Sequence, residues 1–177
     1  MMKLLLHTCC APCSVYCIEY LRTNKIEPTI YWYNPNIHPY KEYEKRKETL
    51  EEYAKIIKVE SVFVDEYGLK EFAKNTVNDL ENRCLNYCYK VRLESTAKYA
   101  KENGYTAFST TLLISPYQKH EIIKEIGEQI AKEYGLEFLY IDFREGFRKG
   151  LAKAREMGLY MQKYCGCVFS EEERYLK

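Results

Sequence analysis

The 177-residue sequence contains no apolar run of 18 residues, the length that a membrane-spanning helix requires. Its apolar start, MKLLL, is too short for the hydrophobic region of a secretory signal, and no small-residue cleavage site follows it. We therefore expect a cytoplasmic protein that has no membrane partner.

The sequence also lacks an excess of charge of either sign. Lys and Arg number 27, Asp and Glu number 26, and the formal net charge is +1. A surface that binds a polyanion must therefore be a local patch. Neither glycine pattern of nucleotide sites, G-x-G-x-x-G or G-x-x-x-x-G-K-[ST], occurs, so we expect no nucleotide cofactor. Only three histidines are present, and no Ser/His/Asp arrangement is indicated.

Cysteine, in contrast, is abundant. In a reducing compartment, cysteines are better suited to metal or redox chemistry than to a disulfide framework. The eight cysteines fall into three tight groups, which argues against a purely structural role. The groups are Cys9, Cys10, Cys13 and Cys17; Cys84 and Cys88; and Cys165 and Cys167.

Short apolar runs alternate with helical patterns along the whole chain. We expect strands over 2–8, 28–33, 60–65, 106–114 and 136–142. We expect helices over 13–25, 40–58, 69–103 with a break near Cys84, and 116–134, followed by a helical tail from Phe147 that KYCGC interrupts. Ser115 and Pro116 are typical of a helix cap and a first helical position. The alternation predicts one α/β domain over 1–177, with a five-stranded parallel sheet in the order 3-2-1-4-5 and helices on both faces.

Parallel sheets of this kind bind ligands at the carboxyl ends of their strands. That edge would display CCAPC, NPNIHPY, the loop at Asp65, ISPYQKH and DFREG. From these loops we select His38 and His120 as candidate proton donors, although each is as consistent with a surface or hydrogen-bonded histidine. His7 is interpreted as structural, and Asp142 either orients a ligand or caps the next segment. The candidate substrate contacts are Asn34, Asn36, Tyr117, Gln118, Arg144 and Arg148.

The spacing of the cysteines indicates two thiol sites. Cys84 and Cys88 are four residues apart on an expected helix and share one face, whereas Cys9 and Cys10 lie on a loop that can bracket a cuboidal cluster. We predict that these four hold a [4Fe–4S] cluster. A zinc ribbon is disfavoured because its cysteine pairs lie close together in sequence, and the radical-SAM spacing C-x3-C-x2-C is absent.

The second site is the CGC segment. Cys165 and Cys167 can chelate one metal ion or close a strained, reducible disulfide, because the intervening Gly166 lets the chain bend. With Cys13 they supply three thiols, enough for a mononuclear metal with an open position. Cys17, one helical turn beyond Cys13, is interpreted as a core residue.

Basic residues form two local clusters near the expected binding edge, with tyrosines between them. The first cluster is Lys41, Lys45, Arg46 and Lys47, and the second is Arg144, Arg148, Lys149, Lys153 and Arg155. Cations that hold phosphates beside aromatic rings that stack on a flipped base are typical of RNA recognition. A solvated helix face is the favoured interpretation of the first cluster, and both interpretations stay open for the second.

Several motifs resemble, in the same order, those of the QueH-type epoxyqueuosine reductases. They are HTCCAPC, YNPNIHPYKEYEKR, RCLNYCYKVRLESTA, FSTTLLISPYQKHEII, DFREGF and GLYMQKYCGC. The resemblance implies a fold like the nucleotide α-hydrolases. It also implies reduction of epoxyqueuosine to queuosine at the wobble position of tRNA, the last step of that modification, without cobalamin.

The resemblance also implies a set of site residues and cofactors. Cys9, Cys10, Cys84 and Cys88 match the positions of a [4Fe–4S] cluster, Cys165 and Cys167 match a redox-active pair, and Cys13 matches a further site cysteine that can join that pair in holding an additional iron. The implied partners are the tRNA anticodon stem-loop and an unidentified electron donor. Two other functions stay open: an RNA-binding zinc module, and a thiol–disulfide oxidoreductase that uses the CGC segment alone.

Overall fold

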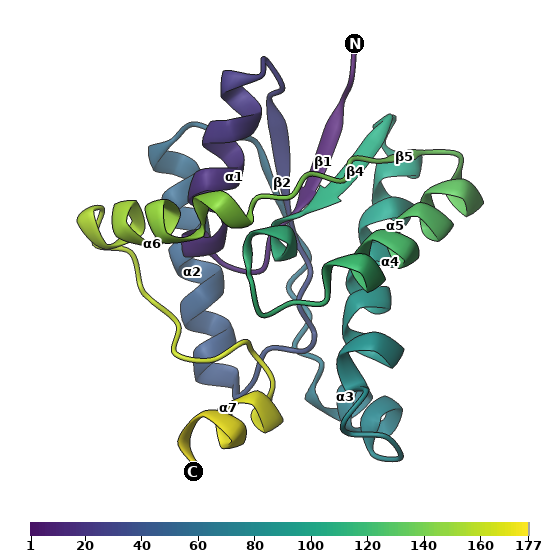
Figure 1. The fold of residues 1–177 in the computed structure, drawn as a ribbon, viewed down its shortest axis with the longest axis vertical. Coiled ribbons are helices and arrows are strands. Elements are labelled where there is room, and N and C mark those ends of the chain that lie inside the picture. The colour runs from purple at the N-terminus through teal and green to yellow at the C-terminus, as the bar shows by residue number, and fades with distance from the viewer. Residues whose placement is uncertain (177) are drawn as a thin grey trace.

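A computed structural model, which describes residues 1–176, contains one parallel sheet in the order β3-β2-β1-β4-β5 (Figure 1). The strands are β1 Leu4–His7, β2 Pro28–Trp32, β3 Ser61–Phe63, β4 Ala107–Thr110 and β5 Glu137–Phe138. In the register of the two central pairs, Leu4 lies beside Pro28 on one side and beside Ala107 on the other. The predicted fold class and strand order are confirmed.

Helices cover both faces of the sheet, as Figure 1 shows. One face carries α1 Ala11–Thr23, α2 Tyr40–Ile56 and α6 Phe147–Glu156, and the other carries α4 Tyr89–Glu102 and α5 His120–Tyr134. Two shorter helices, α3 Leu69–Thr76 and α7 Val168–Tyr175, lie beyond the carboxyl ends of the strands. None of the helices in residues 1–176 is long and apolar enough to cross a membrane.

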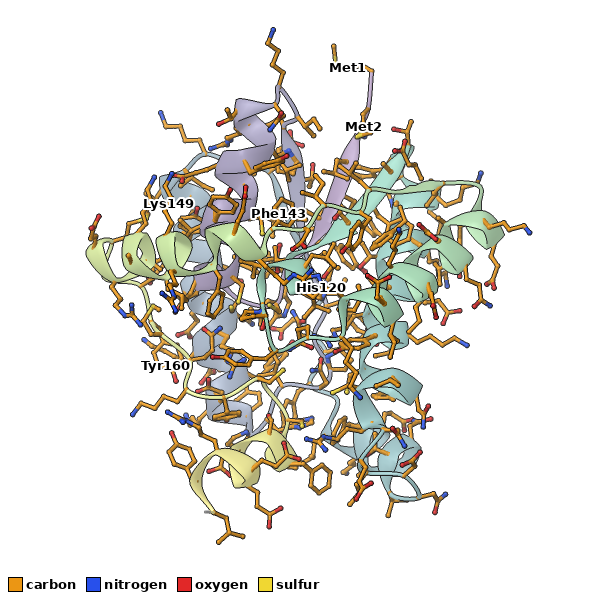
Figure 2. All side chains as sticks on the ribbon, viewed as in Figure 1. Met1, Met2, His120, Phe143, Lys149 and Tyr160 are labelled. Atoms are coloured by element: carbon orange, nitrogen blue, oxygen red, sulfur yellow. The ribbon has the colours of Figure 1, made fainter. Side chains whose placement is uncertain are left out.

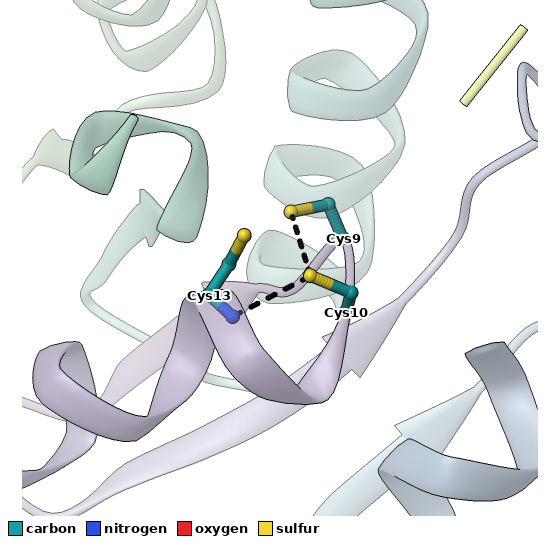
Figure 3. A group of neighbouring side chains, drawn as sticks. All are labelled: Cys9, Cys10 and Cys13. Atoms are coloured by element: carbon teal, nitrogen blue, oxygen red, sulfur yellow. Dashed lines mark hydrogen bonds between the residues drawn. The ribbon is translucent and has the colours of Figure 1, made fainter. Parts of the chain in front are cut away.

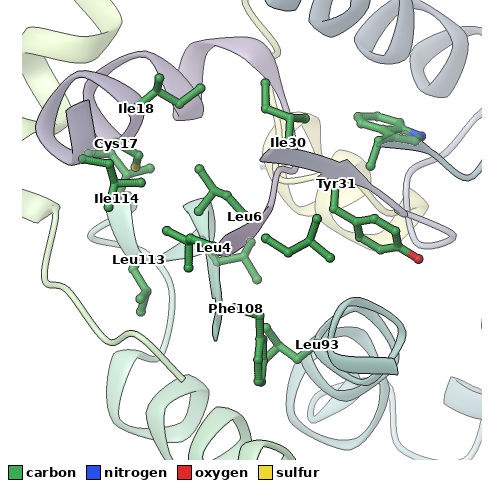
Figure 4. Close-up of a cluster of buried hydrophobic side chains, with 14 of the residues drawn as sticks. Leu4, Leu6, Cys17, Ile18, Ile30, Tyr31, Leu93, Phe108, Leu113 and Ile114 are labelled. Carbon is green, nitrogen blue, oxygen red and sulfur yellow. The ribbon is translucent and has the colours of Figure 1, made fainter. Parts of the chain in front are cut away.

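The core lies where the central strands meet the helices of both layers (Figure 4). All four residues of β1 and all four of β4 are buried, because helices cover both faces of the sheet. Cys17 is fully buried among Ile18, Leu113 and Ile114, so its thiol belongs to the core, as the sequence predicted.

The boundaries next to the binding edge differ from those expected. The helix predicted from Pro116 begins only at His120, because the Ser115 hydroxyl accepts a hydrogen bond from the Tyr117 N–H and forms a local turn instead of a cap. The strand predicted over 106–114 stops at Thr110, whose hydroxyl accepts from the Leu112 N–H and starts a 3-10 turn. The fifth strand keeps only two of the seven residues expected. Each shortened element leaves more irregular chain at the edge of the sheet.

The predicted break lies over 77–82, between α3 and a π-helical turn, Cys84–Cys88, that leads directly into α4. The Tyr89 N–H bonds to the carbonyl of Cys84, five residues back, which is one residue wider than an α-helical turn. Such bulges are frequent at functional sites because they redirect side chains without ending the helix. Here the turn carries both cysteines of the second group.

Candidate metal and redox site

The turn from β1 into α1 brings three thiols together (Figure 3). The sulfur atoms of Cys9, Cys10 and Cys13 all lie within 4.8 Å of one another, and those of Cys9 and Cys10 are 3.9 Å apart. The Cys10 sulfur caps α1 by accepting from the Cys13 N–H at 3.4 Å, so α1 begins at Ala11 and not at Cys13 as expected. We call Cys9, Cys10 and Cys13 the thiol triad.

The thiol triad shares its protons unequally. The pKa of Cys9 lies well below its usual range, because the thiols of Cys10 and Cys13 and the hydroxyl of Thr111 donate to its sulfur. Burial raises the pKa of Cys10, and the hydrogen bond with Cys10 raises the pKa of Cys13. Cys9 is thus the thiol of the triad that loses its proton most readily, and a metal ion would replace the protons of the others.

Gln162, on the chain between α6 and α7, contacts the thiol triad. Its Nε2 lies 2.8 Å from the Cys10 sulfur and 3.6 Å from the Cys13 sulfur, while its Oε1 is buried without a partner. The sequence analysis missed this residue. Its position three residues before Cys165, inside YMQKYCGC, was the only signal.

The second cysteine group lines a separate cavity of about 260 Å³, which we call the π-turn cavity. Its walls include Cys84, Cys88, Cys165 and Cys167. The hydrogen bond from the Cys88 thiol, followed by the nearby charges of Arg92 and Arg83, lowers the pKa of Cys84 to about 6. The same pair interaction raises the pKa of Cys88. This pair therefore also holds one thiolate beside one thiol near neutral pH.

The CGC segment gives its two thiols different surroundings. Cys167 is buried at the start of α7, where its sulfur accepts from the Ser170 N–H and from Arg83 Nε, both at 3.4 Å. Cys165 is exposed, and its sulfur lies 3.3 Å from the amide nitrogen of Gln118. One thiol is thus anchored and the other is accessible from outside.

Gly166 is packed closely against the loop that follows β2. It has no positive φ angle, but a Cβ there would lie 3.2 Å from a side-chain carbon of Ile37. Its carbonyl also accepts from the His38 N–H at 2.7 Å. The CGC segment is therefore packed against the loop after β2, and the chain bends over 163–167, as the sequence predicted.

Arg46 holds the CGC segment in place through hydrogen bonds. Only 2% of this residue is exposed, and its guanidinium donates to the carbonyls of Tyr164 and Cys165 and to Glu42. The charge pattern of its cluster favours a solvated helix face. That interpretation is wrong for Arg46, because a buried guanidinium needs fixed acceptors and here finds them in the CGC segment.

The π-turn cavity adjoins a second cavity of about 420 Å³, the triad cavity, which Cys9 and Cys13 line. Six residues line both: Arg92, Tyr117, Gln118, Cys165, Ser170 and Glu173. The three cysteine groups, far apart in sequence, therefore meet around two cavities with a common wall. Arg92, which the sequence analysis missed, is 3% exposed and donates from Nε to the Cys88 carbonyl at 2.6 Å.

Several residues selected from the edge loops are buried in the framework. Asn34 is fully buried between His7 and the Thr8 carbonyl, and it lines neither cysteine cavity. His38 is also fully buried and packs against Phe72, 3.1 Å from the Pro35 carbonyl. Both residues hold the loop that supports the CGC segment. Asn36, in contrast, lines the π-turn cavity, and its buried Oδ1 has no partner.

Of the remaining selected residues, Tyr117 and Gln118 line both cavities, whereas His120, Arg144 and Arg148 line neither. Tyr117 is 84% exposed and meets Phe147 edge to face, with ring centroids 6.1 Å apart. His120, labelled at the centre of Figure 2, is 5% exposed, with Nε2 at 2.9 Å from the Ser115 carbonyl and Nδ1 without a partner. Arg144 pairs with Asp142 and lowers the pKa of that carboxyl to about 2, while Arg148 is exposed on α6.

Acid is expected to destabilise the fold through His7 and His38. Burial lowers both pKa values to about 4, so the unfolded chain takes up protons first as the pH falls below 6.5. The contribution of the two histidines to stability should therefore be constant above pH 7 and fall between about pH 6.5 and 4, by about 3 kcal/mol for each histidine. Urea unfolding of the metal-free protein at stepped pH measures this loss.

A matched variant separates the two histidines. His38→Gln removes one titrating ring and should lose about half as much stability as the wild type between pH 7 and pH 4. An undiminished loss in that variant would show that His38 is not a source of the pH dependence.

The chain matches the family described as epoxyqueuosine reductase QueH over residues 4–173. An epoxyqueuosine reductase QueH from Dehalococcoides mccartyi is 40% identical over 99% of this chain and 96% of the relative. Another from Thermotoga maritima is 38% identical over 96% of this chain and 91% of the relative. The chain belongs to the QueH family. It is therefore an oxidoreductase.

A solved structure supports the fold of this QueH family member. The crystal structure of a predicted subunit of a tRNA methyltransferase from Methanocaldococcus jannaschii superposes with a TM-score of 0.57 at 16% identity. The match covers 88% of this chain and 75% of that chain, and it agrees with the predicted α/β fold with a parallel sheet.

The thiols of this QueH protein fit a metal or an iron–sulfur cluster. Two thiolates on one tetrahedral ion, with bonds of 2.3 Å, would lie ~3.8 Å apart, and the Cys9 and Cys10 sulfurs are 3.9 Å apart. The buried Oε1 of Gln162 and Oδ1 of Asn36, both without partners, indicate that each cavity has room for a further group. The thiol triad can therefore bind a metal or one side of a cluster.

Proposed function

We propose that this enzyme reduces epoxyqueuosine in tRNA to queuosine, without cobalamin, as a single domain over 1–177 that acts in the cytoplasm. The observation that carries the proposal is that six cysteines line two joined cavities, beside the exposed Tyr117. Conversion of the epoxide to an alkene consumes two electrons and two protons and releases the oxygen as water. A site rich in thiols can supply both.

For the cofactor we propose one [4Fe–4S] cluster on Cys9, Cys10, Cys84 and Cys88. When bound, such a cluster supplies electrons one at a time, so a two-electron reduction needs a second redox element beside it. The remaining thiols, Cys13, Cys165 and Cys167, supply that element as a dithiol or as ligands of a second iron. Cys165 is well placed for this role because it lines both cavities.

The geometry of the thiol triad supports an alternative set of metal ligands. Cys13 lies with Cys9 and Cys10 within 4.8 Å, so these three can form one side of a metal site without Cys84 and Cys88. In that arrangement the pair on the π-helical turn, beside Cys167 in the π-turn cavity, would be the redox partner. Cys84 and Cys88 bind iron in the first set, whereas Cys13 binds it in the alternative set.

The dithiol version of the reaction balances with residues of this chain alone. Two thiols, Cys165 and Cys167, give up two electrons and two protons and form a disulfide, while the epoxide C–O bonds break and water leaves. Gln118 and Arg83 hold the two sulfurs before reaction. An external electron donor must then reduce the disulfide to two thiols before the next turnover.

Substrate contacts follow from the walls of the cavities. Tyr117 offers its exposed ring for stacking on a flipped base, and Gln118 and Asn36 offer amide groups inside. Of the two histidines, we propose His120 for proton supply, because it directly follows Gln118 and Lys119, which line the π-turn cavity. His38 is fully buried, and neither of its neighbours in the chain, Ile37 and Pro39, lines a cysteine cavity.

The function is tested with protein purified and reconstituted without oxygen, incubated with tRNA that carries epoxyqueuosine and a chemical reductant. We expect a band at roughly 400 nm, about four sulfides per chain, and nucleosides that show queuosine formed without cobalamin. Zinc in a colourless protein, with epoxyqueuosine unchanged, would instead support an RNA-binding zinc module.

We propose an RNA contact at the start of α6, where Arg144 lies in the 3-10 turn before the helix and Arg148 in its first turn, and this contact predicts a salt-dependent defect. Arg144→Glu with Arg148→Glu reverses two exposed charges beside Phe147, which lines the triad cavity. The affinity for tRNA should fall, and the slope of log affinity against log salt should become shallower by about 1 to 2. Unchanged binding would place the docking face elsewhere.

A further inference from the structure

A groove of about 760 Å³ lies between the start of α2 and the C-terminal α7, next to the cysteine cavities. Its walls carry three lysines and three tyrosines. They are Lys41, Lys45, Tyr160, Lys163, Tyr164 and Tyr175. We call this the α2–α7 groove. Tyr160, labelled in Figure 2, lies on the chain between α6 and α7. Its hydroxyl donates a hydrogen bond to Glu42 on α2, so the two sides of the groove are joined there.

The α2–α7 groove adjoins the triad cavity. Lys163 and Tyr164 line both the α2–α7 groove and the triad cavity, so they form a common wall between the two. This wall is held in place. The Tyr164 hydroxyl donates to the His38 carbonyl at 2.5 Å, and the Arg46 guanidinium lies 5.2 Å from the Tyr164 ring centroid. A polymer with one unit in the triad cavity would have its next unit at the groove.

The charge in the groove suits a phosphate backbone. Lys41, Lys45 and Lys163 are all exposed. Glu42, one of two acids in the walls, is already bonded to Arg46 at 2.7 Å and to Tyr160 at 2.6 Å, so its charge is compensated within the protein. A net positive surface therefore remains.

The aromatic rings suit unpaired bases. Tyr175 is 57% exposed at the end of α7, and Tyr160 lies beneath Lys45, whose ammonium is 6.0 Å from the ring centroid. Cations beside exposed aromatic faces form the platforms on which proteins bind single-stranded nucleic acid, because every base presents a face that can stack.

We propose that the α2–α7 groove binds the unpaired nucleotides of the anticodon loop that adjoin the base undergoing reduction. The lysines hold their phosphates, and Tyr160 and Tyr175 stack on their bases. This inference rests on the proposed function, since it assigns to the groove the neighbours of the nucleotide that enters the triad cavity. The α2–α7 groove and α6 are then the two RNA contacts, one on each side of the triad cavity.

The test compares two triple variants of the reconstituted holoenzyme with equal changes in net charge. The first is Lys41→Glu, Lys45→Glu and Lys163→Glu in the groove. The control is Lys98→Glu, Lys101→Glu and Lys132→Glu, on exposed positions of α4 and α5. The probe is a fluorescent anticodon stem-loop RNA, and the readouts are the Kd, its salt dependence and the absorption spectrum.

We expect the groove variant to raise the Kd about tenfold or more and to make the salt slope shallower by about 2, as loss of three phosphate contacts to a single strand requires. The control should leave both nearly unchanged. Tyr175→Ala should raise the Kd about tenfold while Tyr175→Phe preserves it, because stacking needs the ring and not the hydroxyl. Intact spectra show that the variants are folded.

Equal effects of the two triple variants, or no effect of either, would overturn the inference. So would normal RNA binding by the groove variant combined with slower reduction at saturating RNA, because that result would assign the groove to an acidic electron-donor protein. Failure of the proposed function looks different: the wild-type holoenzyme would bind the RNA but leave epoxyqueuosine unreduced.

Discussion

Cys84→Ser should abolish the absorption band at roughly 400 nm, remove about four sulfides per chain and lower activity at least about a thousandfold. The reason is that Cys84 holds the thiolate of its pair, with its pKa lowered to about 6, and a thiolate is the form that binds iron. Absorption spectra with iron and sulfide counts on anaerobically reconstituted variants provide the measurement.

Two further variants make this result decisive between the ligand sets. If the cluster is held by Cys9, Cys10, Cys84 and Cys88, then Cys13→Ser should keep the cluster and lose activity. If the thiol triad holds the metal, Cys13→Ser should lose iron and Cys84→Ser should keep it. Cys17→Ala is the matched control, because Cys17 is fully buried in the core and should be dispensable for iron binding.

Arg92→Gln should lower activity about a hundredfold and shift the reactivity of Cys84 toward higher pH. Within residues 1–176, no carboxylate forms an ion pair with Arg92, although only 3% of the residue is exposed. A buried guanidinium without an acidic partner is unfavourable unless negative charge lies nearby. Here that charge comes from thiolates, and the guanidinium in turn helps to lower the pKa of Cys84.

The measurement is the rate of alkylation of the metal-free protein against pH. In the wild type, the Cys84 thiolate should be lost as the pH falls through about 6. In Arg92→Gln the midpoint should rise by about one unit, since a nearby charge moves a pKa by that order. Arg92→Lys keeps the charge and should stay close to the wild type in midpoint. An unchanged midpoint in Arg92→Gln would remove Arg92 from the electrostatics of the site.

The local patterns of the chain were sufficient for the framework. Buried apolar strands, alternating with helices, predicted the parallel sheet and its order, because a parallel strand covered on both faces is apolar throughout. The grouping of the cysteines predicted a thiol site at the carboxyl ends of the strands. The helix start at Ser115 was predicted wrongly, because a turn between Ser115 and Tyr117 uses the same hydroxyl.

The sequence by itself therefore determined the fold class, the strand order and the kind of chemistry. Only the tertiary structure decided which thiols are neighbours. It placed Cys13 with Cys9 and Cys10, and it set Cys167 against Cys88. It also buried Arg46 and Arg92 beside the CGC segment and the π-helical turn. The physical reason is that strand and helix periods are local, whereas the partner of a buried charge or thiol depends on which distant segments the folded chain brings within a few ångströms.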